Sequence, residues 1–229
     1  MSIHRLFAGL DRCAPGDSHS LARACAGLAP GAGVLDAGCG TGADLPALLA
    51  LVPEGRITAV DLSEDFIAGV RKRHPTVRAA VADMTDPPGG PFDLIWSGGA
   101  IYGPGLAVAL AAWRGRLVPG GRVAFTDLVL RGEGVSPEVA AFLAEEGVPL
   151  RNVAGHHAAV AASGWRCVDG FWLPDSAWDA YYLPLEHRLN ATRDDPEMAE
   201  VVAAFRREIA LWRQYGTEYG YYLMTVVPQ

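Results

Sequence analysis

The chain has 229 residues, of which 50% are apolar and 20% charged, and its formal net charge is −7. This length and apolar content suit a single α/β domain with a sizeable core. The acidic balance argues against a broad phosphate-binding face, and no apolar run approaches the roughly 18 residues that a membrane-spanning helix needs.

The N-terminus and the cysteines indicate the cellular setting. The opening stretch MSIHRLFAGLDR has no apolar region of the secretory type before its charges. Cys13, Cys25, Cys39 and Cys167 show no C-x-x-C spacing, which argues against a disulfide framework and a zinc site. We therefore expect a cytoplasmic protein without a metal, a monomer or homodimer that binds neither nucleic acid nor membrane.

Hydrophobic periodicity and turn residues predict an alternation of strands and helices. Ser63 caps a predicted helix with acidic residues in its first turn and basic residues in its last, as the helix dipole favours. In chain order we expect a strand at 34–36, a helix at 41–51, a strand at 57–60, a helix at 63–74, strands at 77–81 and 92–96, a helix at 106–117, a strand at 122–130, helices at 136–147 and 154–162, a strand at 165–172, helical structure at 175–216 and a strand at 219–227.

This alternation is typical of an α/β fold of Rossmann-like type, with a doubly wound sheet. We predict seven strands, parallel except for the last, which we place antiparallel at the sheet edge. Two parts lie outside the alternation, a helical N-terminal segment and a helical insert before the last strand. We accordingly divide the single domain into an N-terminal cap (1–30), a core (31–174), an insert or lid (175–216) and the last strand (217–229).

Polar residues follow successive predicted strands, and ligands of such sheets bind outside the carboxyl ends of the strands. Asp36, Asp61, Asp83 and Ser97 all stand at such ends. After Asp36 comes the glycine-rich stretch GCGTGA, residues 38–43, which also satisfies the dinucleotide fingerprint with alanine in last place. Asp61, about twenty residues further on, could accept the ribose hydroxyls of a dinucleotide or of another nucleotide-like cofactor. The glycines and Asp61 therefore do not decide which cofactor the loop binds.

Two carboxylates discriminate better between the cofactors. Asp36 stands two residues before the first glycine, where it would repel a pyrophosphate and attract an ammonium or sulfonium group. Asp83, two strands on, could accept from an adenine amino group. Three carboxylates around one pocket favour a cationic ligand over a dianionic one.

Five stretches resemble, in order, the motifs of class I S-adenosylmethionine (SAM)-dependent methyltransferases. They are VLDAGCGTG, ITAVDLS, VADM, FDLIWSGGAIY and LVPGGRVAFTD, between about residues 30 and 130. Within this superfamily, the DLIWSxGAIY signature, the segment LDRxxPGD and the tail motifs WxxYYxPL and YGYYL resemble a bacterial family of small-molecule methyltransferases of the methyltransferase-domain group.

The resemblance implies a SAM-dependent methyltransferase (EC 2.1.1.-) that transfers a methyl group to a small molecule by in-line displacement and releases S-adenosylhomocysteine. It implies that the three loop glycines cradle the methionine part, that Asp36 supports the amino group or the loop, and that Asp61 holds the ribose. Leu62 would lie against the adenine, Asp83 and Met84 at its edge and face, and the Ser97–Gly98 pair near the sulfonium. The implied cofactor-binding residues are Asp36, Gly38, Cys39, Gly40, Thr41, Gly42, Asp61, Leu62, Asp83, Met84, Ser97 and Gly98.

The sequence says less about the residues that would bind the methyl acceptor. Tyr102 follows the fourth predicted strand and is our candidate catalytic residue, and Trp178, Tyr181 and Tyr182 could also wall a substrate pocket. Glu186 or a histidine could alternatively serve as a base, and Cys39 has no evident base to activate it as a nucleophile. An NAD-linked oxidoreductase and a non-catalytic SAM-binding sensor are the alternative functions.

Overall fold

A single mixed sheet organises the protein, seen in a computed structural model that describes residues 2–229, with side chains from Arg5 onward. Met1, the first residue of the predicted N-terminal cap, lies outside the described residues. Over the described chain the sheet has seven strands in the order β3-β2-β1-β4-β5-β7-β6, and every neighbouring pair is parallel except those that involve β7. The strands are β1 (Gly33–Ala37), β2 (Arg56–Asp61), β3 (Arg78–Val81), β4 (Phe92–Gly98), β5 (Leu117–Leu130), β6 (Trp165–Trp172) and β7 (Tyr219–Pro228).

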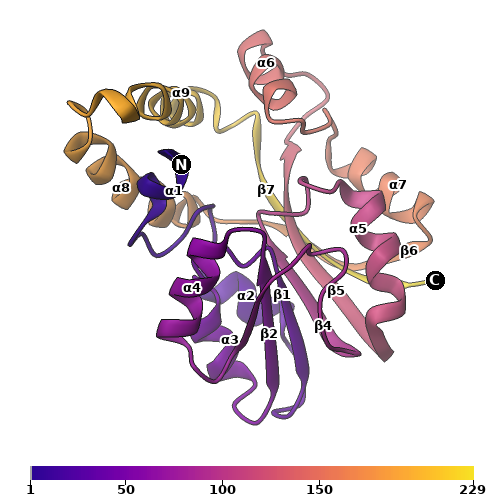
Figure 1. The fold of residues 1–229 in the computed structure, drawn as a ribbon. Coiled ribbons are helices and arrows are strands. Elements are labelled where there is room, and N and C mark those ends of the chain that lie inside the picture. Colours follow the sequence, from indigo (N-terminus) through magenta and orange to yellow (C-terminus); the bar gives the residue numbers. More distant parts are fainter. Residues whose placement is uncertain (1) are drawn as a thin grey trace.

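Helices cover both faces of the sheet, as a doubly wound α/β fold requires (Figure 1). Apolar side chains of α2, α3 and α4 belong to one core, and those of α5 and α7 belong to the core on the opposite face. The helices are α1 (Ser2–Phe7), α2 (Ser18–Ala24), α3 (Leu45–Leu51), α4 (Glu64–Arg73), α5 (Leu106–Trp113), α6 (Pro137–Glu145), α7 (Val153–Ala162), α8 (Asp175–Ala191) and α9 (Ala199–Tyr215), with 3-10 turns at Arg114–Arg116 and Pro196–Met198.

Four helices, α1, α6, α8 and α9, stand above the carboxyl ends of the strands (Figure 1). Residues of α1, α6, α8 and α9 join the core on the face that α2 to α4 cover, and α1 contacts both α8 and α9. The helical N-terminus and the helical pair before the last strand therefore meet over the edge of the sheet where ligands of this fold bind. None of the described helices has the length and apolar character that crossing a bilayer demands.

The predicted alternation and the doubly wound parallel sheet are confirmed, but the position of the last strand is wrong. β7 pairs with β5 on one side and with β6 on the other, so the edges of the sheet are β3 and β6. β6 runs parallel to β5 two places away, and β7 lies antiparallel between them and pairs with both. Eight of the ten β7 residues are buried, which also suits an interior strand.

Two predicted boundaries shift for local reasons. The helix expected from residue 41 begins at Leu45, because turns extend the glycine loop to Asp44 and Pro46 then occupies a first-turn position. The fifth strand begins at Leu117 instead of Arg122 and runs through the expected Pro-Gly-Gly turn, with an irregular register against β4 between Phe92 and Leu94.

Candidate functional site

The glycine-rich loop joins β1 to α3 by a path that needs glycines at three positions. Gly38, Gly40 and Gly42 have φ angles of 78°, 51° and 81°, in the left-handed region that other residues avoid. The N–H groups of Gly38 and Cys39 both donate to the carbonyl of Val60, 2.9 Å away, which ties the loop to β2. A methyl group added at Gly38 would lie only 2.5 Å from the Cβ of Ala100, so the loop also packs against the turn after β4.

Asp61, the last residue of β2, links the glycine loop to the start of α4. Its Oδ2 accepts from the N–H of Gly40 at 2.9 Å, and its Oδ1 accepts from the N–H of Ser63 at 2.8 Å. The carboxylate is only partly covered, and each oxygen has a second lone pair. Asp61 can therefore hold the loop and still accept hydroxyl groups from a ligand.

Asp36 is the most unusual polar residue beside the loop. Its side chain is 2% exposed, and Oδ2 has no hydrogen-bond partner among the described residues. Burial, followed by the nearby carboxylates Asp44 and Asp61, raises the pKa of Asp36 well above its ordinary value, and Arg12 opposes this. A buried carboxyl group with an unused oxygen is costly unless a cationic partner arrives.

Asp44 is a site residue that the sequence reasoning missed. Its Oδ1 accepts from Arg12 at 2.8 Å and its Oδ2 accepts from the indole N–H of Trp96 at 2.8 Å. A methyl group added at Gly98 would lie 3.0 Å from Asp44 Oδ2, so Asp44 reaches across to the end of β4. We had placed Asp44 inside a helix, and no sequence signal brings it to Trp96.

The N-terminal segment before α2 crosses over the glycine loop. The hydroxyl of Thr41 donates to the carbonyl of Asp11 at 2.7 Å, and the Arg12–Asp44 ion pair adds a second tie. A methyl group added at Gly40 would lie 3.6 Å from Cys13 Sγ. The Asp11–Arg12 stretch in the motif LDRxxPGD is therefore what brings this segment onto the loop.

The remaining predicted cofactor residues lie around the same strand ends, in different environments. Met84 lies 3.8 Å from a methyl group added at Gly38, whereas Leu62 is 75% exposed. Asp83 is exposed, and its hydrogen bonds from the backbone and hydroxyl of Thr85 lower its pKa.

Ser97 and Cys39 are buried beside them. The Ser97 hydroxyl has no partner among the described side chains and backbone groups. The pKa of Cys39 is raised by burial and then by Asp36 and Asp61, so this thiol stays protonated and packs in the loop.

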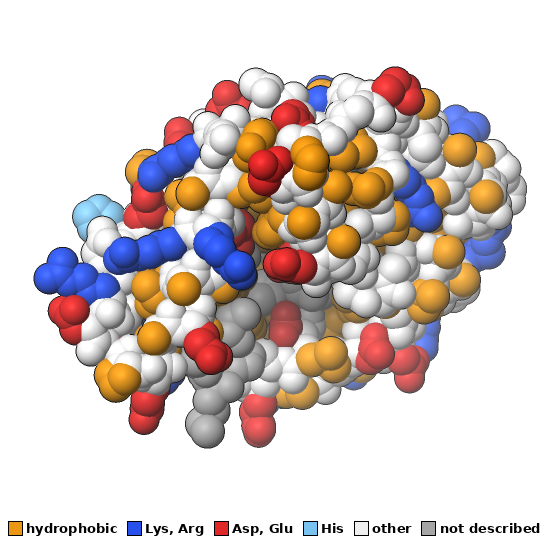
Figure 2. Space-filling model, turned by 90° about the horizontal axis from the view of Figure 1, so that it is seen from above, with side chains coloured by type: hydrophobic (Ala, Val, Ile, Leu, Met, Phe, Trp, Pro, Cys, Tyr) orange, Lys and Arg blue, Asp and Glu red, His pale blue; other side chains and the backbone are white. Residues whose placement is uncertain are grey.

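A large cavity opens beside this loop, above the ends of β5 and β7. Its volume is about 810 Å³, which is within the range of small-molecule sites. Cys13 and Ala14 of the N-terminal segment and Phe66 of α4 form the wall next to the loop, and residues of α6, α8 and α9 form most of the rest. Figure 2 looks down on this end of the molecule, which is hollowed near its centre and has both acidic and basic side chains around the hollow. Tyr102, Trp178, Tyr181 and Tyr182, our candidates for a pocket wall, all line the cavity.

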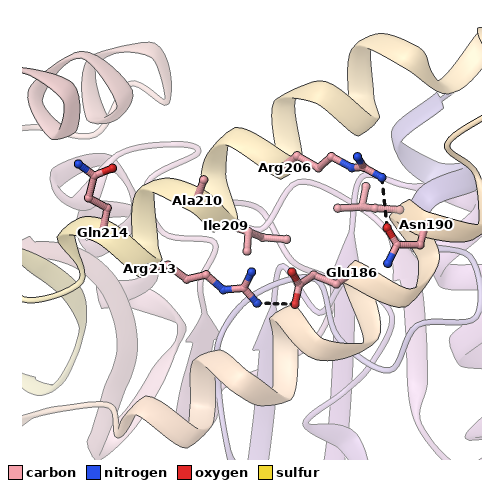
Figure 3. A pocket seen from close by; sticks show the side chains of 8 residues that line it. Glu186, Asn190, Arg206, Ile209, Ala210, Arg213 and Gln214 are labelled. Atoms are coloured by element: carbon pink, nitrogen blue, oxygen red, sulfur yellow. Dashed lines mark hydrogen bonds and ion pairs between the residues drawn. The ribbon is translucent and has the colours of Figure 1, made fainter.

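The structure places the candidates for a catalytic base in different environments. Burial, followed by Glu146 and Glu208, raises the pKa of Tyr102, so its phenol keeps its proton and is poorly suited to act as a base. Glu186 lies in a separate groove between α8 and α9, where Arg213 donates to it at 2.6 Å (Figure 3). The described wall of the cavity contains no histidine, and His156 is buried beside Asp127 instead.

Comparisons with known proteins agree with this arrangement. Residues 34–121 match the family model of the methyltransferase domain. Phosphoethanolamine N-methyltransferase 3 of Arabidopsis thaliana is 27% identical over 191 residues, an alignment that covers 79% of this chain and 37% of the plant protein. This chain thus spans little more than a third of that relative.

Solved structures share the whole fold. A SAM-dependent methyltransferase from Geobacter sulfurreducens, in complex with S-adenosylhomocysteine, has a TM-score of 0.82 at 20% identity and covers 100% of this chain and 98% of its own. The [4+2]-cyclase SpnF has a TM-score of 0.73 at 18% identity, with 98% and 90% covered. Residues 34–121 thus match the methyltransferase-domain model, and the chain as a whole shares the fold of these SAM-dependent methyltransferases.

Proposed function

We propose that the protein transfers the methyl group of SAM to a small-molecule acceptor in the 810 Å³ cavity. The observation that carries the proposal is the buried, unpartnered Oδ2 of Asp36 beneath a glycine loop held by Asp61. This pair suits a cofactor with cationic groups and ribose hydroxyls. A pyrophosphate would have to lie over the Asp36, Asp44 and Asp61 carboxylates, which disfavours the oxidoreductase alternative.

The residues around the loop fit SAM. Gly38, Gly40 and Gly42 give the loop the positive-φ path that would bring its backbone against the methionine part, Asp36 is placed for its amino group, and Asp61 for its ribose. When bound, SAM would supply a methyl group already activated by the sulfonium, from which the acceptor would displace S-adenosylhomocysteine in line. The task of the protein is then to align the acceptor and exclude water, and good alignment alone contributes roughly 7–11 kcal/mol.

Replacing Asp61 with alanine tests the cofactor assignment. We expect SAM to bind the wild-type protein in isothermal titration, and Asp61→Ala to weaken this binding roughly 10–100-fold, because hydrogen bonds to a charged group contribute about 1.5–3 kcal/mol. Asp65→Ala, an exposed carboxylate on α4, is the matched control and should bind as the wild type does. Absence of SAM binding to folded protein, or saturable binding of NADH at the same site, would refute the proposal.

Methyl transfer itself separates an enzyme from a SAM-binding sensor, and the [4+2]-cyclase shows that this fold is compatible with other chemistry. Incubation of metabolite extracts with methyl-labelled SAM should yield a labelled product that requires the protein. Loss of that product with Asp61→Ala, but not with Asp65→Ala, would exclude the sensor.

We further propose that the N-terminal cap and the insert at 175–216 close over the site as a lid. The cap is tied to α8 by the N–H of Gly16, which donates to Ala177 O at 3.3 Å, and to the loop by the Arg12–Asp44 pair. A closed lid would exclude water during transfer.

Limited proteolysis with thermolysin measures this closure. SAM should slow cleavage of both segments in the wild-type protein. Arg12→Gln should speed cleavage of the cap about fivefold, the factor that corresponds to about 1 kcal/mol of local stability. Arg71→Gln, on the surface of α4, is the control variant. Cleavage rates that SAM leaves unchanged would contradict the lid.

A further inference from the structure

The cavity beside the glycine loop has a lining of unusual chemistry, in which aromatic rings predominate. Many of these rings hold one another in place, since Tyr181 and Tyr182 lie 4.9 Å apart and Trp178 stacks on Trp212 at 3.6 Å. Such packing makes the wall largely preformed. The aromatic residues of the wall are Phe7, Phe66, Tyr102, Phe142, Trp178, Tyr181, Tyr182, Phe205, Tyr219 and Tyr221.

Carboxylates supply almost all the charge of this wall. Glu138 and Glu145 of α6, Glu146 directly after it and Glu208 of α9 line the cavity, and the one cationic residue in the described wall is the exposed Arg207. Aromatic faces and carboxylates both attract cations and disfavour anions. The lining is therefore suited to a positively charged ligand with an apolar body.

Glu208 is the carboxylate most enclosed by the rings. Its Oε1 accepts from the hydroxyl of Tyr182 at 3.0 Å, while Glu138, Glu145 and Glu146 are exposed. Burial raises the pKa of Glu208 to about 7, with a smaller rise from Glu146 and an opposing effect of Tyr182. A cationic ligand would relieve the cost of holding this carboxylate charged.

Two lining residues carry buried polar groups without partners. The indole N–H of Trp178 and the hydroxyl of Tyr219 make no hydrogen bond within the described residues, and these side chains are 2% and 1% exposed. Most buried donors in folded proteins have a hydrogen-bond partner.

We infer that the methyl acceptor is an organic amine on an aromatic or apolar body, bound as the ammonium ion against Glu208 and the surrounding rings. For transfer, the ammonium would give one proton to the Glu208 carboxylate, and the freed lone pair of the amine would displace S-adenosylhomocysteine from the methyl carbon, leaving the methylated ammonium ion. The inference rests on the proposed function and names the substrate class of the same site. A phosphorylated amine, the acceptor that the name of the plant relative implies, is disfavoured, because its phosphate would face four carboxylates and a single exposed guanidinium.

Binding measured in the presence of S-adenosylhomocysteine tests the inference without requiring turnover. Phenethylamine and tryptamine are the cationic probes, phenylacetate is the anionic probe of similar shape, and phosphoethanolamine is the phosphorylated one. We expect the two arylamines to bind and the two anionic compounds to bind at least about tenfold more weakly, since like charges are brought together in the cavity.

Variants then assign the effect to Glu208. Glu208→Gln should weaken arylamine binding about 10–100-fold, and Glu200→Gln, an exposed residue of the same helix, should change it less than about twofold. Tyr182→Phe removes the hydrogen bond but leaves the carboxylate, so it should retain arylamine binding even if the glutamine variant folds poorly.

Three results would overturn the inference: tighter binding of phenylacetate or phosphoethanolamine than of the arylamines, no arylamine binding at millimolar concentration, or equal effects of Glu208→Gln and Glu200→Gln. A separate SAM titration on the same samples keeps the two proposals apart. Failure of that titration would refute the proposed function, whereas SAM binding without arylamine binding would refute only the acceptor class.

Discussion

Gly38→Ala is expected to abolish cofactor binding and to destabilise the protein by about 2–5 kcal/mol. Its φ of 78° costs another residue about 1–2 kcal/mol. The added methyl group would also lie 2.5 Å from the Cβ of Ala100, and overpacking of this kind costs roughly 1–3 kcal/mol. Either the loop or the turn after β4 must move, and both border the proposed cofactor site. Thermal unfolding and SAM titration measure the two effects.

Gly27→Ala is the matched control for backbone strain. Gly27 has a φ of 79°, almost that of Gly38, but a methyl group added there meets nothing within 4 Å. It should therefore show only the strain, about 1–2 kcal/mol, and bind SAM normally. In the double variant Gly38→Ala/Ala100→Gly the clashing methyl group is gone, so stability should return to about that of Gly27→Ala. Additive effects of the two substitutions would show that Ala100 is not the obstacle.

The parallel part of the sheet could be predicted because its signals are local. A short apolar run that ends in Asp61, followed by a helix that Ser63 caps, specifies the β2–α4 unit by itself. The place of β7 could not be predicted in this way, because the lateral order of strands depends on which backbone edges are left unpaired after the others assemble. The division into cap, core and insert stays a prediction.

The candidate site was predictable where it follows the strand ends. Asp36, Asp61 and the glycines meet because neighbouring parallel strands end together, and Asp61 contacts Gly40 directly. The sequence does not predict Asp44 and Glu208 as site residues, because their places in the site depend on tertiary contacts. Asp44 contacts Trp96, and Glu208 contacts Tyr182. Neither has a neighbour in sequence that signals a site.

The enclosed carboxyl group of Glu208 predicts that the ligand-free protein loses stability as the pH rises. Its pKa is about 7 in the folded protein and 4.5 in an unfolded chain, so folding takes up a proton between these values. The contribution of Glu208 is most favourable below about pH 4.5, declines up to about pH 7 and is then constant. At about 1.4 kcal/mol per pH unit, the loss is roughly 2–4 kcal/mol.

Glu208→Gln isolates this effect, because an amide cannot titrate and can still bond to Tyr182. The variant should match the wild type near pH 4.5 and, at pH 8, unfold at a temperature roughly 5–10 °C higher. Glu200→Gln should follow the wild type at both pH values. The difference between the variants reports on Glu208 alone, because the groups that face it remain in all three proteins. These groups are Tyr182 and Tyr181 on α8, Tyr219 and Tyr221 on β7, Tyr102 after β4 and Glu146 directly after α6. A variant with the same pH profile as the wild type would show that Glu208 is already ionised in the folded protein at pH 5. A cationic ligand should act in the opposite direction, since it stabilises the ionised carboxylate and restores at pH 8 the stability that the empty cavity lacks.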